Sequence, residues 1–458
     1  MSAPIRTVSP RSPAESGGWT ALLSMRRLGA EREDDAPRSG FQRDWDRILY
    51  SPHFRRLAGK TQVFPLPLDD HIHSRLTHSL EVATVGRSLG TLVGQRLACA
   101  LPAGIEPRDL GDCVAAACLA HDLGNPPFGH IGEDAIQEFF ARHAEAPWLA
   151  SFTEAQRRDL LTFEGNAVAL RLAMQPAGAL SPRGLDLTCA TLGALVKYPC
   201  ASTDALGRQS GKKSRSKHGI DTPQLAGFAE VADTLGLARD PAALAGVWRR
   251  HPLAFLTEAA DDIAYQIIDL EDGLRLKHVP ASEFLELLQP LCEHDPSCPP
   301  LVPGRTRDGM LELASRVRSI AINTLIHEVA EVFQREEARI HTGAFDEALV
   351  DHITSRAAVE HIKTKNLEAC YTARDVLKLE LTGSVAIQAV LERLVDAAIS
   401  GRSVRSRHLL KLYSGALAGD DLYTRVLRLT DFVAGMTDHY VVRLYRELSG
   451  IRLPGGRD

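Results

Sequence analysis

The stretch AACLAHDLGNPPFGHIGE, residues 116–133, largely decides how this chain is interpreted. An alanine-rich apolar run ends in His121 and Asp122, two metal-ligand side chains directly before a Gly-Asn-Pro-Pro sequence that stops a helix. His130 and Glu133 follow, and their spacing of three suits one face of a helix. The stretch therefore predicts a helix end that carries metal ligands, followed by two groups that can handle protons.

Two other segments supply further candidate ligands. SRLTHSLEV (74–82) places His78 in the first turn of a helical pattern, with Ser74 or Thr77 as the cap. EAADDIAYQIIDLEDG (258–273) contributes the adjacent pair Asp261 and Asp262. Alone, each would be an ordinary polar residue more often than a ligand, but the joint pattern predicts a metal site.

Mixed nitrogen and oxygen ligation indicates which ions such a site would take. Two imidazoles and two carboxylates suit Mn²⁺, Fe²⁺, Co²⁺, Ni²⁺ or Mg²⁺ better than a thiolate-rich structural zinc. Coordination positions that the protein leaves open can hold water and a phosphoryl oxygen. The residues by themselves therefore point to a metal-dependent hydrolase.

Composition is that of an ordinary soluble protein. The 458 residues are 44% hydrophobic and 24% charged, enough for one large or two smaller domains. No apolar run approaches the roughly 20 residues that span a bilayer, and no signal-peptide segment is apparent. We therefore expect a cytoplasmic protein with no membrane partner. The formal net charge of −5 argues against a dedicated nucleic-acid coat, although a local basic funnel could gather an anionic substrate.

The cysteines and one basic segment allow weaker hypotheses. The eight cysteines have no CxxC spacing, which fits buried or free thiols in a reducing compartment. Cys292, His294 and Cys298 form a weak zinc-like cluster in a proline-rich segment, where we favour an ordinary loop. The basic segment 212–217 could touch DNA, but a solvated loop is the simpler interpretation.

Hydrophobic periodicity predicts a mainly α chain. Apolar residues recur at helical spacing over 77–97, 110–121, 255–270, 311–335 and 385–399. Alternating β-branched runs are few and no strand–helix repeat occurs, which argues against a doubly wound sheet.

The organisation along the chain follows from composition. Residues 1–40 are rich in Pro, Gly and Ser and are predicted to be partly mobile. The clearest internal loops are 201–219 and 292–309. We expect a catalytic core over 41–300 and a C-terminal helical extension, packed on that core, over 301–458.

These segments together resemble the HD-domain deoxynucleoside triphosphate triphosphohydrolases, specifically their bacterial dGTPase and dGTPase-like branch. The matching segments are RRLAGKTQVFPL (55–66), SRLTHSLEV (74–82), AHDLGNPPFGHIGE (120–133), FEGNA (163–167), LGALVKYP (192–199), LTEAADDIAYQIIDLEDG (256–273) and DFVAGMTDHYVVRLYRELSGI (431–451). The resemblance implies a helical HD phosphohydrolase fold with a C-terminal extension.

The implied activity is metal-dependent hydrolysis of a dNTP, with dGTP preferred, to the deoxynucleoside and inorganic tripolyphosphate. Such an enzyme limits dNTP pools. The resemblance also implies a homo-oligomer, either a tetramer or a hexamer, in some relatives with a nucleotide or single-stranded DNA activator.

Roles for individual residues follow from the same resemblance. His78, His121, Asp122 and Asp261 would bind a divalent ion, such as Mn²⁺, Mg²⁺, Fe²⁺ or Co²⁺. Asp261 is preferred over Asp262 because the family's metal aspartate is followed by Tyr at four residues and Asp at eight, as Asp261 is by Tyr265 and Asp269. By implication these last two contact the deoxyribose, and Asp262 is a supporting or structural residue.

The implied catalytic pair is His130 and Glu133. A partner carboxylate can hold an imidazole in one tautomer and stabilise the imidazolium. His130 could therefore attack phosphorus transiently, position water or protonate a leaving oxygen, and the sequence does not choose among these.

A triphosphate needs cations around it, because its charge must be neutralised before a nucleophile approaches. Arg75, Lys197, Tyr198 and Lys217 are the implied contacts. Lys217 departs from the family pattern, since His218 replaces the usual phenylalanine after it.

Base recognition has the weakest support. Arg56, Leu57 and Gln62 lie in the segment that approaches the base in relatives, yet their chemistry does not separate guanine from other bases. Tyr265 packed against the sugar could exclude a 2′-hydroxyl by its bulk.

Two alternatives remain. One is an HD phosphohydrolase of another specificity, acting on nucleoside monophosphates or cyclic nucleotides; the KTQVFP and VKYP segments count against it. The other is a nucleotide or single-stranded DNA sensor that keeps the pocket only for binding. The presence of all candidate ligands and of both catalytic candidates counts against the sensor.

Overall fold

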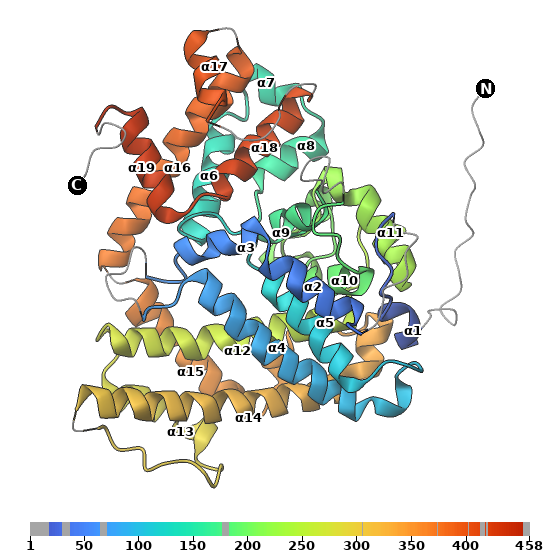
Figure 1. Ribbon diagram of the computed structural model, residues 1–458, viewed down its shortest axis with the longest axis vertical. Coiled ribbons are helices and arrows are strands. Elements are labelled where there is room, and N and C mark those ends of the chain that lie inside the picture. Colours follow the sequence, from blue (N-terminus) through green and yellow to red (C-terminus); the bar gives the residue numbers. More distant parts are fainter. Residues whose placement is uncertain are drawn as a thin grey trace.

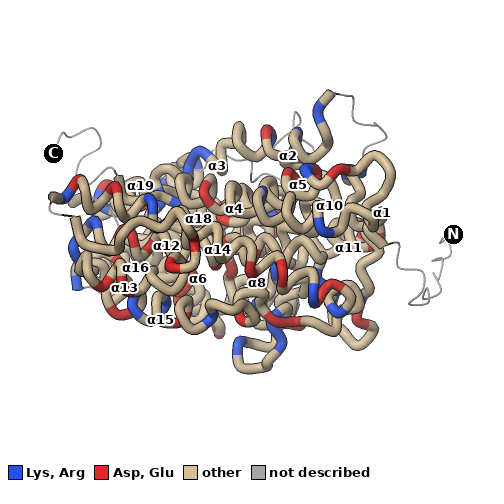
Figure 2. The backbone as a smooth tube through the Cα atoms, turned by 90° about the horizontal axis from the view of Figure 1, so that it is seen from below, with Lys and Arg blue, Asp and Glu red and all other residues tan. Residues whose placement is uncertain are grey.

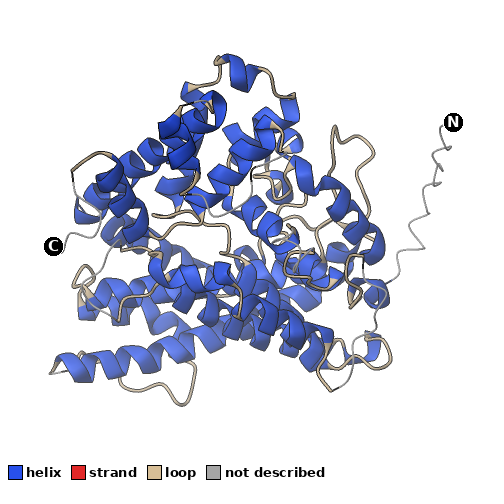
Figure 3. Ribbon diagram, turned by 45° about the horizontal axis from the view of Figure 1, so that its top comes forward, coloured by secondary structure: helices blue, strands red, loops and turns tan. Residues whose placement is uncertain are grey.

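Helices and the turns between them make up the described chain (Figure 3). The computed structural model describes residues 18–29, 37–64, 71–175, 183–304, 306–372, 374–401, 403–412, 417 and 420–451. Within these ranges no β-strand forms, and only isolated β-bridges occur. The prediction of a mainly α chain is confirmed. Much of the predicted N-terminal segment, residues 1–17 and 30–36, lies outside the described residues.

The α-helices are α1 (Gly18–Leu22), α2 (Gly40–Leu49), α3 (Pro52–Arg56), α4 (Arg75–Arg96), α5 (Pro107–Ala120), α6 (His130–Arg142), α7 (Pro147–Ala150), α8 (Glu154–Leu161), α9 (Gly165–Met174), α10 (Cys189–Leu195), α11 (Leu225–Leu235), α12 (Pro252–Arg275), α13 (Ala281–Cys292), α14 (Arg307–Thr342), α15 (Arg356–Asn366), α16 (Arg374–Ser400), α17 (Val404–Leu410), α18 (Leu422–Ala434) and α19 (Asp438–Leu448). Each of the five helical stretches expected from periodicity lies within, or within one residue of, one of these helices.

The helices, whose arrangement is shown in Figure 1, pack around two hydrophobic clusters. The first cluster holds the buried faces of α4, α5, α12 and α14, together with α10, α11, α13 and α15. The second cluster joins α6, α7 and α8 to α16, α18 and α19, which come from the end of the chain. The location of the domain boundary stays a prediction.

Glycines let α4 and α5 approach backbone to backbone. A Cβ at Gly90 would lie 2.7 Å from the carbonyl oxygen of Leu110, and a Cβ at Gly94 would lie 2.8 Å from that of Pro107. On α5, a Cβ at Gly111 would lie 2.8 Å from the carbonyl oxygen of Arg87. Because the two helices run antiparallel, this contact brings the start of α4 beside the end of α5.

The caps of α4 and α12 fix where these helices begin. Ser74 is the N-cap of α4 and forms a capping box with Thr77, so of the two caps expected from the sequence Ser74 is the one that the structure shows. His251 caps α12: its Nδ1 accepts from the backbone N–H of Leu253, and its Nε2 lies 2.9 Å from the carbonyl oxygen of Leu22. The ring is therefore neutral, with its proton on Nε2.

None of the helices in the described parts of the chain combines the length and apolar character that a bilayer-spanning segment needs. Acidic and basic residues are interspersed over the face in Figure 2.

We expect Gly90→Ala to destabilise the fold by about 1–3 kcal/mol, because the added methyl meets backbone atoms that cannot turn aside. Gly227 in α11 is the control, since a Cβ there meets only the terminal methyl of Met174. Gly227→Ala should be neutral or stabilising, as alanine favours a helix over glycine. Urea unfolding of the two variants checks this, and equal stability would contradict the backbone contact.

The His251 cap should make stability depend on pH. Burial lowers the pKa of His251 to about 4, below its ordinary value near 6.5. Between pH 6.5 and pH 4 the histidine is protonated in the unfolded chain but not in the folded chain. The stabilisation of the fold by the neutral His251 is therefore complete above pH 6.5 and is lost as the pH falls toward 4. At pH 5 the loss is about 2 kcal/mol.

The comparison is with His251→Asn, which keeps a capping oxygen but does not titrate. The wild type should be the more stable protein at pH 7.5, and its advantage should shrink by pH 5. A difference in the free energy of unfolding that stays constant with pH would contradict a neutral buried cap.

Candidate active site

A cavity of about 500 Å³ is lined by residues from both hydrophobic clusters. Eleven of the twelve predicted site residues line it: Arg75, His78, His121, Asp122, His130, Glu133, Lys197, Tyr198, Lys217, Asp261 and Tyr265. The twelfth, Asp269, is completely buried and is not among the lining residues.

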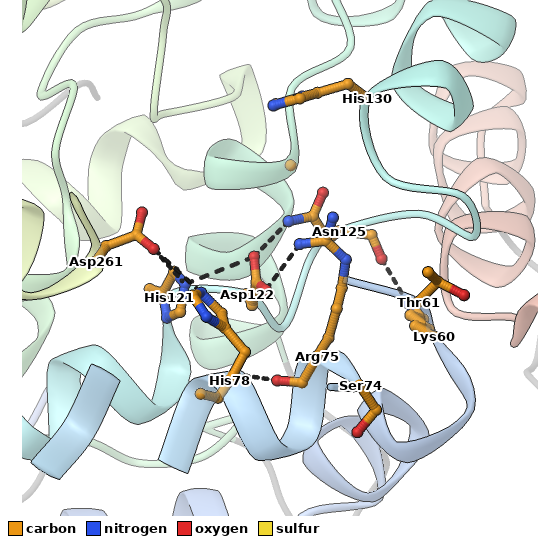
Figure 4. A network of polar contacts seen from close by, with 12 residues as sticks. Lys60, Thr61, Ser74, Arg75, His78, His121, Asp122, Asn125, His130 and Asp261 are labelled. Carbon is orange, nitrogen blue, oxygen red and sulfur yellow. Dashed lines mark hydrogen bonds and ion pairs between the residues drawn. The ribbon is translucent and has the colours of Figure 1, made fainter. Parts of the chain in front are cut away.

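Three predicted metal ligands converge at one end of this cavity (Figure 4). His78 from the first turn of α4 and His121 at the end of α5 both point toward Asp261 from α12. Oδ1 of Asp261 lies 3.1 Å from Nε2 of His78 and 3.5 Å from Nε2 of His121. Among the described residues, this is the group of His, Cys, Asp and Glu whose ligand atoms all lie within 4.8 Å of one another.

The donor set fits a divalent ion. Neighbouring ligand atoms on an octahedral ion with bonds of about 2.1 Å lie about 3 Å apart, close to the distances observed here. His121 Nδ1 lies 2.6 Å from the carbonyl oxygen of Cys118, so this nitrogen carries the proton and Nε2 keeps a lone pair facing Asp261. Two imidazole nitrogens and carboxylate oxygens could therefore hold the ion.

Asp122 lies beside this group, held by other side chains. Its Oδ1 is 3.7 Å from His121 Nε2 and accepts a hydrogen bond from Asn125, while its Oδ2 accepts from Arg75 at 2.8 Å. Burial alone would raise the pKa of Asp122, but Arg75 and the two histidines hold it well below its usual value. Asp122 is therefore an anion and could complete the ligand set.

The neighbouring aspartates differ in environment. Burial opposes the charge of Asp261, but His121 and His78 hold its pKa below the ordinary value. Burial, opposed by Lys197 and reinforced by Glu258 and Asp261, raises the pKa of Asp262 to about 7. Of the two, Asp261 belongs to the group of converging ligand atoms, and its role as a metal ligand stays a prediction.

His130 and Glu133 form a separate pair at the start of α6. His130 Nδ1 lies 3.1 Å from Oε2 of Glu133, and the histidine side chain is 75% exposed. Figure 4 places His130 apart from the converging histidines and Asp261. Glu133 is buried, and its Oε1 accepts from the backbone N–H of Gly165 at 2.8 Å. Burial would raise the pKa of Glu133, but His130, Lys217 and that N–H lower it, so the carboxylate stays charged.

Each predicted phosphate-binding cation is already held by a carboxylate. Arg75 is bonded to Asp122, as described above. Lys197 Nζ lies 3.2 Å from Oε1 of Glu258, and Lys217 Nζ lies 2.6 Å from Oε2 of Glu164. The cations therefore have fixed positions before any substrate arrives.

Relatives of this chain were identified by sequence comparison. The HD domain family matches residues 75–166, which include His78, His121 and Asp122. The deoxyguanosinetriphosphate triphosphohydrolase-like proteins of Synechocystis sp. and Pseudomonas aeruginosa are each 39% identical over 95% of this chain and cover 100% and 99% of their own length. The deoxyguanosinetriphosphate triphosphohydrolase of Salmonella typhimurium is 29% identical over 90% of this chain and 94% of its own.

The chain belongs to the HD-domain deoxynucleoside triphosphate triphosphohydrolase family, in its dGTPase-like branch. It is therefore a hydrolase, and the predicted family membership is confirmed. Which residues carry the reaction is not tested by these comparisons, so the roles assigned above stay predictions.

Two tyrosines of this HD hydrolase face the cavity together. Tyr265 and Tyr371 are stacked with ring centroids 5.8 Å apart, and Tyr371 Oη donates to Oδ2 of Asp269 at 2.6 Å. Asp269 therefore supports Tyr371 from behind the cavity wall. Sequence reasoning missed Tyr371, because it lies in a π-helical turn (Leu367–Tyr371) far from any recognised segment.

Sequence reasoning missed further lining residues of this HD hydrolase. They are Thr61, Asn125, Glu164, Asn166, Arg208, Glu258 and Glu380. Glu164 and Asn166 lie within the matching segment FEGNA, so this segment was the signal that could have identified them. Of the residues expected near the base, Gln62 lines the cavity, whereas Leu57 is buried and Arg56 is not a lining residue.

The other segments considered from the sequence make ordinary contacts. Cys292 is buried with its Sγ 3.5 Å from the carbonyl oxygen of Val317, whereas His294 is 92% exposed. They form no group of converging ligand atoms with Cys298 in the described chain, which agrees with an ordinary loop. His218 is buried beside Lys217, and burial lowers the pKa of His218 to about 3. It is neutral there.

The adjacent aspartates offer a direct test of the metal site. Asp261→Ala should weaken Mn²⁺ binding by more than the roughly 10- to 100-fold typical of a residue that only orients a ligand. Asp262→Ala removes a neighbouring carboxylate and should weaken binding by less. Isothermal titration of Mn²⁺ checks this, and the reverse order would move the ligand role to Asp262.

Proposed function

We propose that this protein hydrolyses deoxynucleoside triphosphates, dGTP foremost, to the deoxynucleoside and inorganic tripolyphosphate, and thereby limits dNTP pools. The observation that carries the proposal is one cavity that combines the converging ligands His78, His121 and Asp261 with the separate pair His130 and Glu133. Relatives over nearly the whole chain are named for hydrolysis of deoxyguanosine triphosphate, which supports the same reaction class.

Charge balance supports a need for a metal ion. Among the described lining residues, Asp and Glu number seven and Lys and Arg number four, so carboxylates outnumber the fixed cations. A triphosphate would be repelled by such a cavity unless a divalent cation offset the excess. When bound by His78, His121, Asp122 and Asp261, the ion would polarise the α-phosphoryl group and activate water.

His130 and Glu133 would manage a proton at the reacting phosphoryl group. The hydrogen bond from Nδ1 to Glu133 leaves Nε2 of His130 for the substrate or a water molecule. The charged carboxylate of Glu133 stabilises the imidazolium that forms when Nε2 takes a proton. The pair thus suits proton transfer at the bond between the α-phosphorus and the 5′-oxygen.

The lysines and Arg75 would hold the phosphate chain. Lys197 and Lys217 come from separate segments and both line the cavity, and each is fixed by a buried carboxylate. Burial would lower the pKa of each lysine, but its carboxylate partners raise the value above normal, so both stay charged. Fixed cations of this kind stabilise charge without having to reorganise.

The stacked pair Tyr265 and Tyr371 would bind the sugar. A rigid aromatic wall leaves little room for a 2′-hydroxyl, which favours a deoxyribose over a ribose. Asp269 fixes the Tyr371 hydroxyl and, through it, the shape of this wall.

Four broader expectations belong to the same proposal: the location, the oligomeric state, the ion and an activator. We expect a cytoplasmic homo-oligomer, a tetramer or hexamer, with Mn²⁺, Mg²⁺, Fe²⁺ or Co²⁺ as the ion. A nucleotide or single-stranded DNA activator fits the family resemblance. The alternatives of another nucleotide specificity, or of a sensor without turnover, are outcomes of the test below.

Product analysis by ³¹P NMR tests the proposal. With Mn²⁺ and dGTP, the wild type should release tripolyphosphate, and a panel of dNTPs and GTP should give slower or no turnover. The double variant His121→Ala/Asp122→Ala should lose at least about 100-fold in rate, because two ligands are gone.

Other products would redirect the assignment. Pyrophosphate or orthophosphate would indicate another phosphohydrolase class. Nucleotide binding without any product would favour the sensor.

A further inference from the structure

Two segments that match the family hold none of the predicted metal ligands and neither member of the predicted catalytic pair. They are residues 55–66, of which the structure describes 55–64 from the end of α3 onward, and residues 431–451, which run from the end of α18 through α19. The structure brings them together beneath the loop that links His121 to His130.

We propose that Lys60 and Asp438 form a clamp that fixes this loop and so sets the position of His130 relative to the metal ligands. Both act through other residues and are positioning residues. The catalytic consequence of the clamp rests on the proposed function, whereas its effect on the loop does not.

Asp438 is the centre of the clamp. It is the first residue of α19 and is 1% exposed. Its Oδ1 accepts from the backbone N–H of Phe128 at 3.0 Å, and its Oδ2 accepts from the N–H and the hydroxyl of Thr61 at 2.9 and 2.5 Å. A buried carboxylate with three donors is stabilised only while all three stay in place, so it ties the loop to both segments.

Lys60 makes the second set of bonds. It is 2% exposed, and its ammonium group donates to the carbonyl oxygens of Ala434, at 2.7 Å, and of Asn125. Its own carbonyl oxygen accepts from the backbone N–H of Arg75 at 2.9 Å, at the start of α4. Figure 4 shows Lys60 and Thr61 beside Asn125, on the side of the loop away from Asp261. One lysine thus joins the end of α18, the loop and the metal-bearing helix.

The part of the loop that Asp438 holds, Phe128 and Gly129, has an unusual backbone conformation. Phe128 and Gly129 have φ values of 60° and 59°, a region that a bulky residue such as phenylalanine rarely adopts. Gly129 adopts its positive φ without strain, is the N-cap of α6 and supplies no capping side chain, so His130 begins the helix two residues after the strained Phe128. The bond from Phe128 N–H to Asp438 therefore determines where α6 begins.

The clamp matters because the two parts of the site come from different clusters. His78, His121 and Asp261 are carried by helices of the first cluster, and His130 is carried by α6 of the second. Proton transfer and phosphoryl chemistry are sensitive to displacements of about 1 Å, which can cost 100-fold in rate. Lys60 and Asp438 cross the boundary between the clusters at the point where such a displacement would occur.

A second contact, made by Gly383 of α16, restrains Phe128. A Cβ at Gly383 would lie 2.4 Å from Cδ2 of Phe128, so only glycine leaves room for this ring. Gly383→Ala would displace the ring of Phe128. The same change should favour α16 itself, because alanine is a better helix former than glycine. This variant perturbs the loop without removing any buried charge.

The experiment compares Asp438→Asn and Gly383→Ala with Asp159→Asn. Asp159 is the control, because it is also a buried carboxylate with three donors, from Ser202, Thr222 and Tyr423, and contacts no residue of the loop. Hydrogen–deuterium exchange of a peptide covering residues 123–131 should be at least about tenfold faster in both test variants, and unchanged in the control.

Steady-state kinetics gives the second readout. In the test variants kcat should fall about 10- to 100-fold while KM for the dNTP and the Mn²⁺ affinity stay near the wild-type values. The control should lose stability without this selective loss of kcat.

The outcomes separate the two proposals. Exchange over 123–131 that changes no more in the test variants than in the control would overturn the clamp, whatever the turnover. A wild type that hydrolyses no dNTP would overturn the proposed function, and the exchange data would still decide the clamp. Faster exchange with unchanged kcat would overturn the positioning role.

Discussion

The close contact between α4 and α5 is the constraint on which the rest of this protein depends. Side chains at Gly90, Gly94 or Gly111 would hold the two backbones apart, and their absence lets the antiparallel helices touch. His78 begins one helix and His121 ends the other, so the contact sets the separation of the two imidazoles. The ring centroids lie 5.4 Å apart, a distance that lets both Nε2 atoms face Asp261. The close packing of α4 and α5 in the core thereby determines the spacing of His78 and His121 in the candidate metal site.

The second principle of the site is that charges come in fixed pairs. Arg75 with Asp122, Lys197 with Glu258 and Lys217 with Glu164 each place a cation and its carboxylate partner together in the cavity lining. Pairing keeps the buried charges stable, and it also limits how much positive charge the protein offers by itself. On the proposed function, a divalent ion would supply the positive charge that the side chains lack next to the triphosphate. The clamp of Lys60 and Asp438 works differently, since each of these buried side chains holds backbone groups: Lys60 binds two carbonyl oxygens, and Asp438 binds two backbone N–H groups.

Local structure was largely predictable from the sequence, whereas contacts between distant segments were not. Helical periodicity, the Ser74 cap and the proline stop after His121 are local signals, and the corresponding helices form where they predict. The spacing of Asp261, Tyr265 and Asp269 also predicts one helix face, yet only packing puts Asp269 behind Tyr371 rather than in the cavity. The bond between Asp438 and Phe128 joins residues 310 positions apart, and neither has a periodicity or cap that predicts the other. The resemblance located the segments that carry these residues, but their contacts required the fold.

The central claim is that α4, α5 and α12 assemble one divalent metal site, with His130 outside it. Anomalous X-ray diffraction from crystals grown with Mn²⁺ tests this most directly. The account predicts an anomalous peak about 2.0–2.3 Å from Nε2 of His78, Nε2 of His121 and a carboxylate oxygen of Asp261, with Asp122 as the fourth ligand and His130 not coordinated. An ion bound by His130 and Glu133 would contradict this account. So would an ion bound at Asp262 with His78 and His121 uncoordinated.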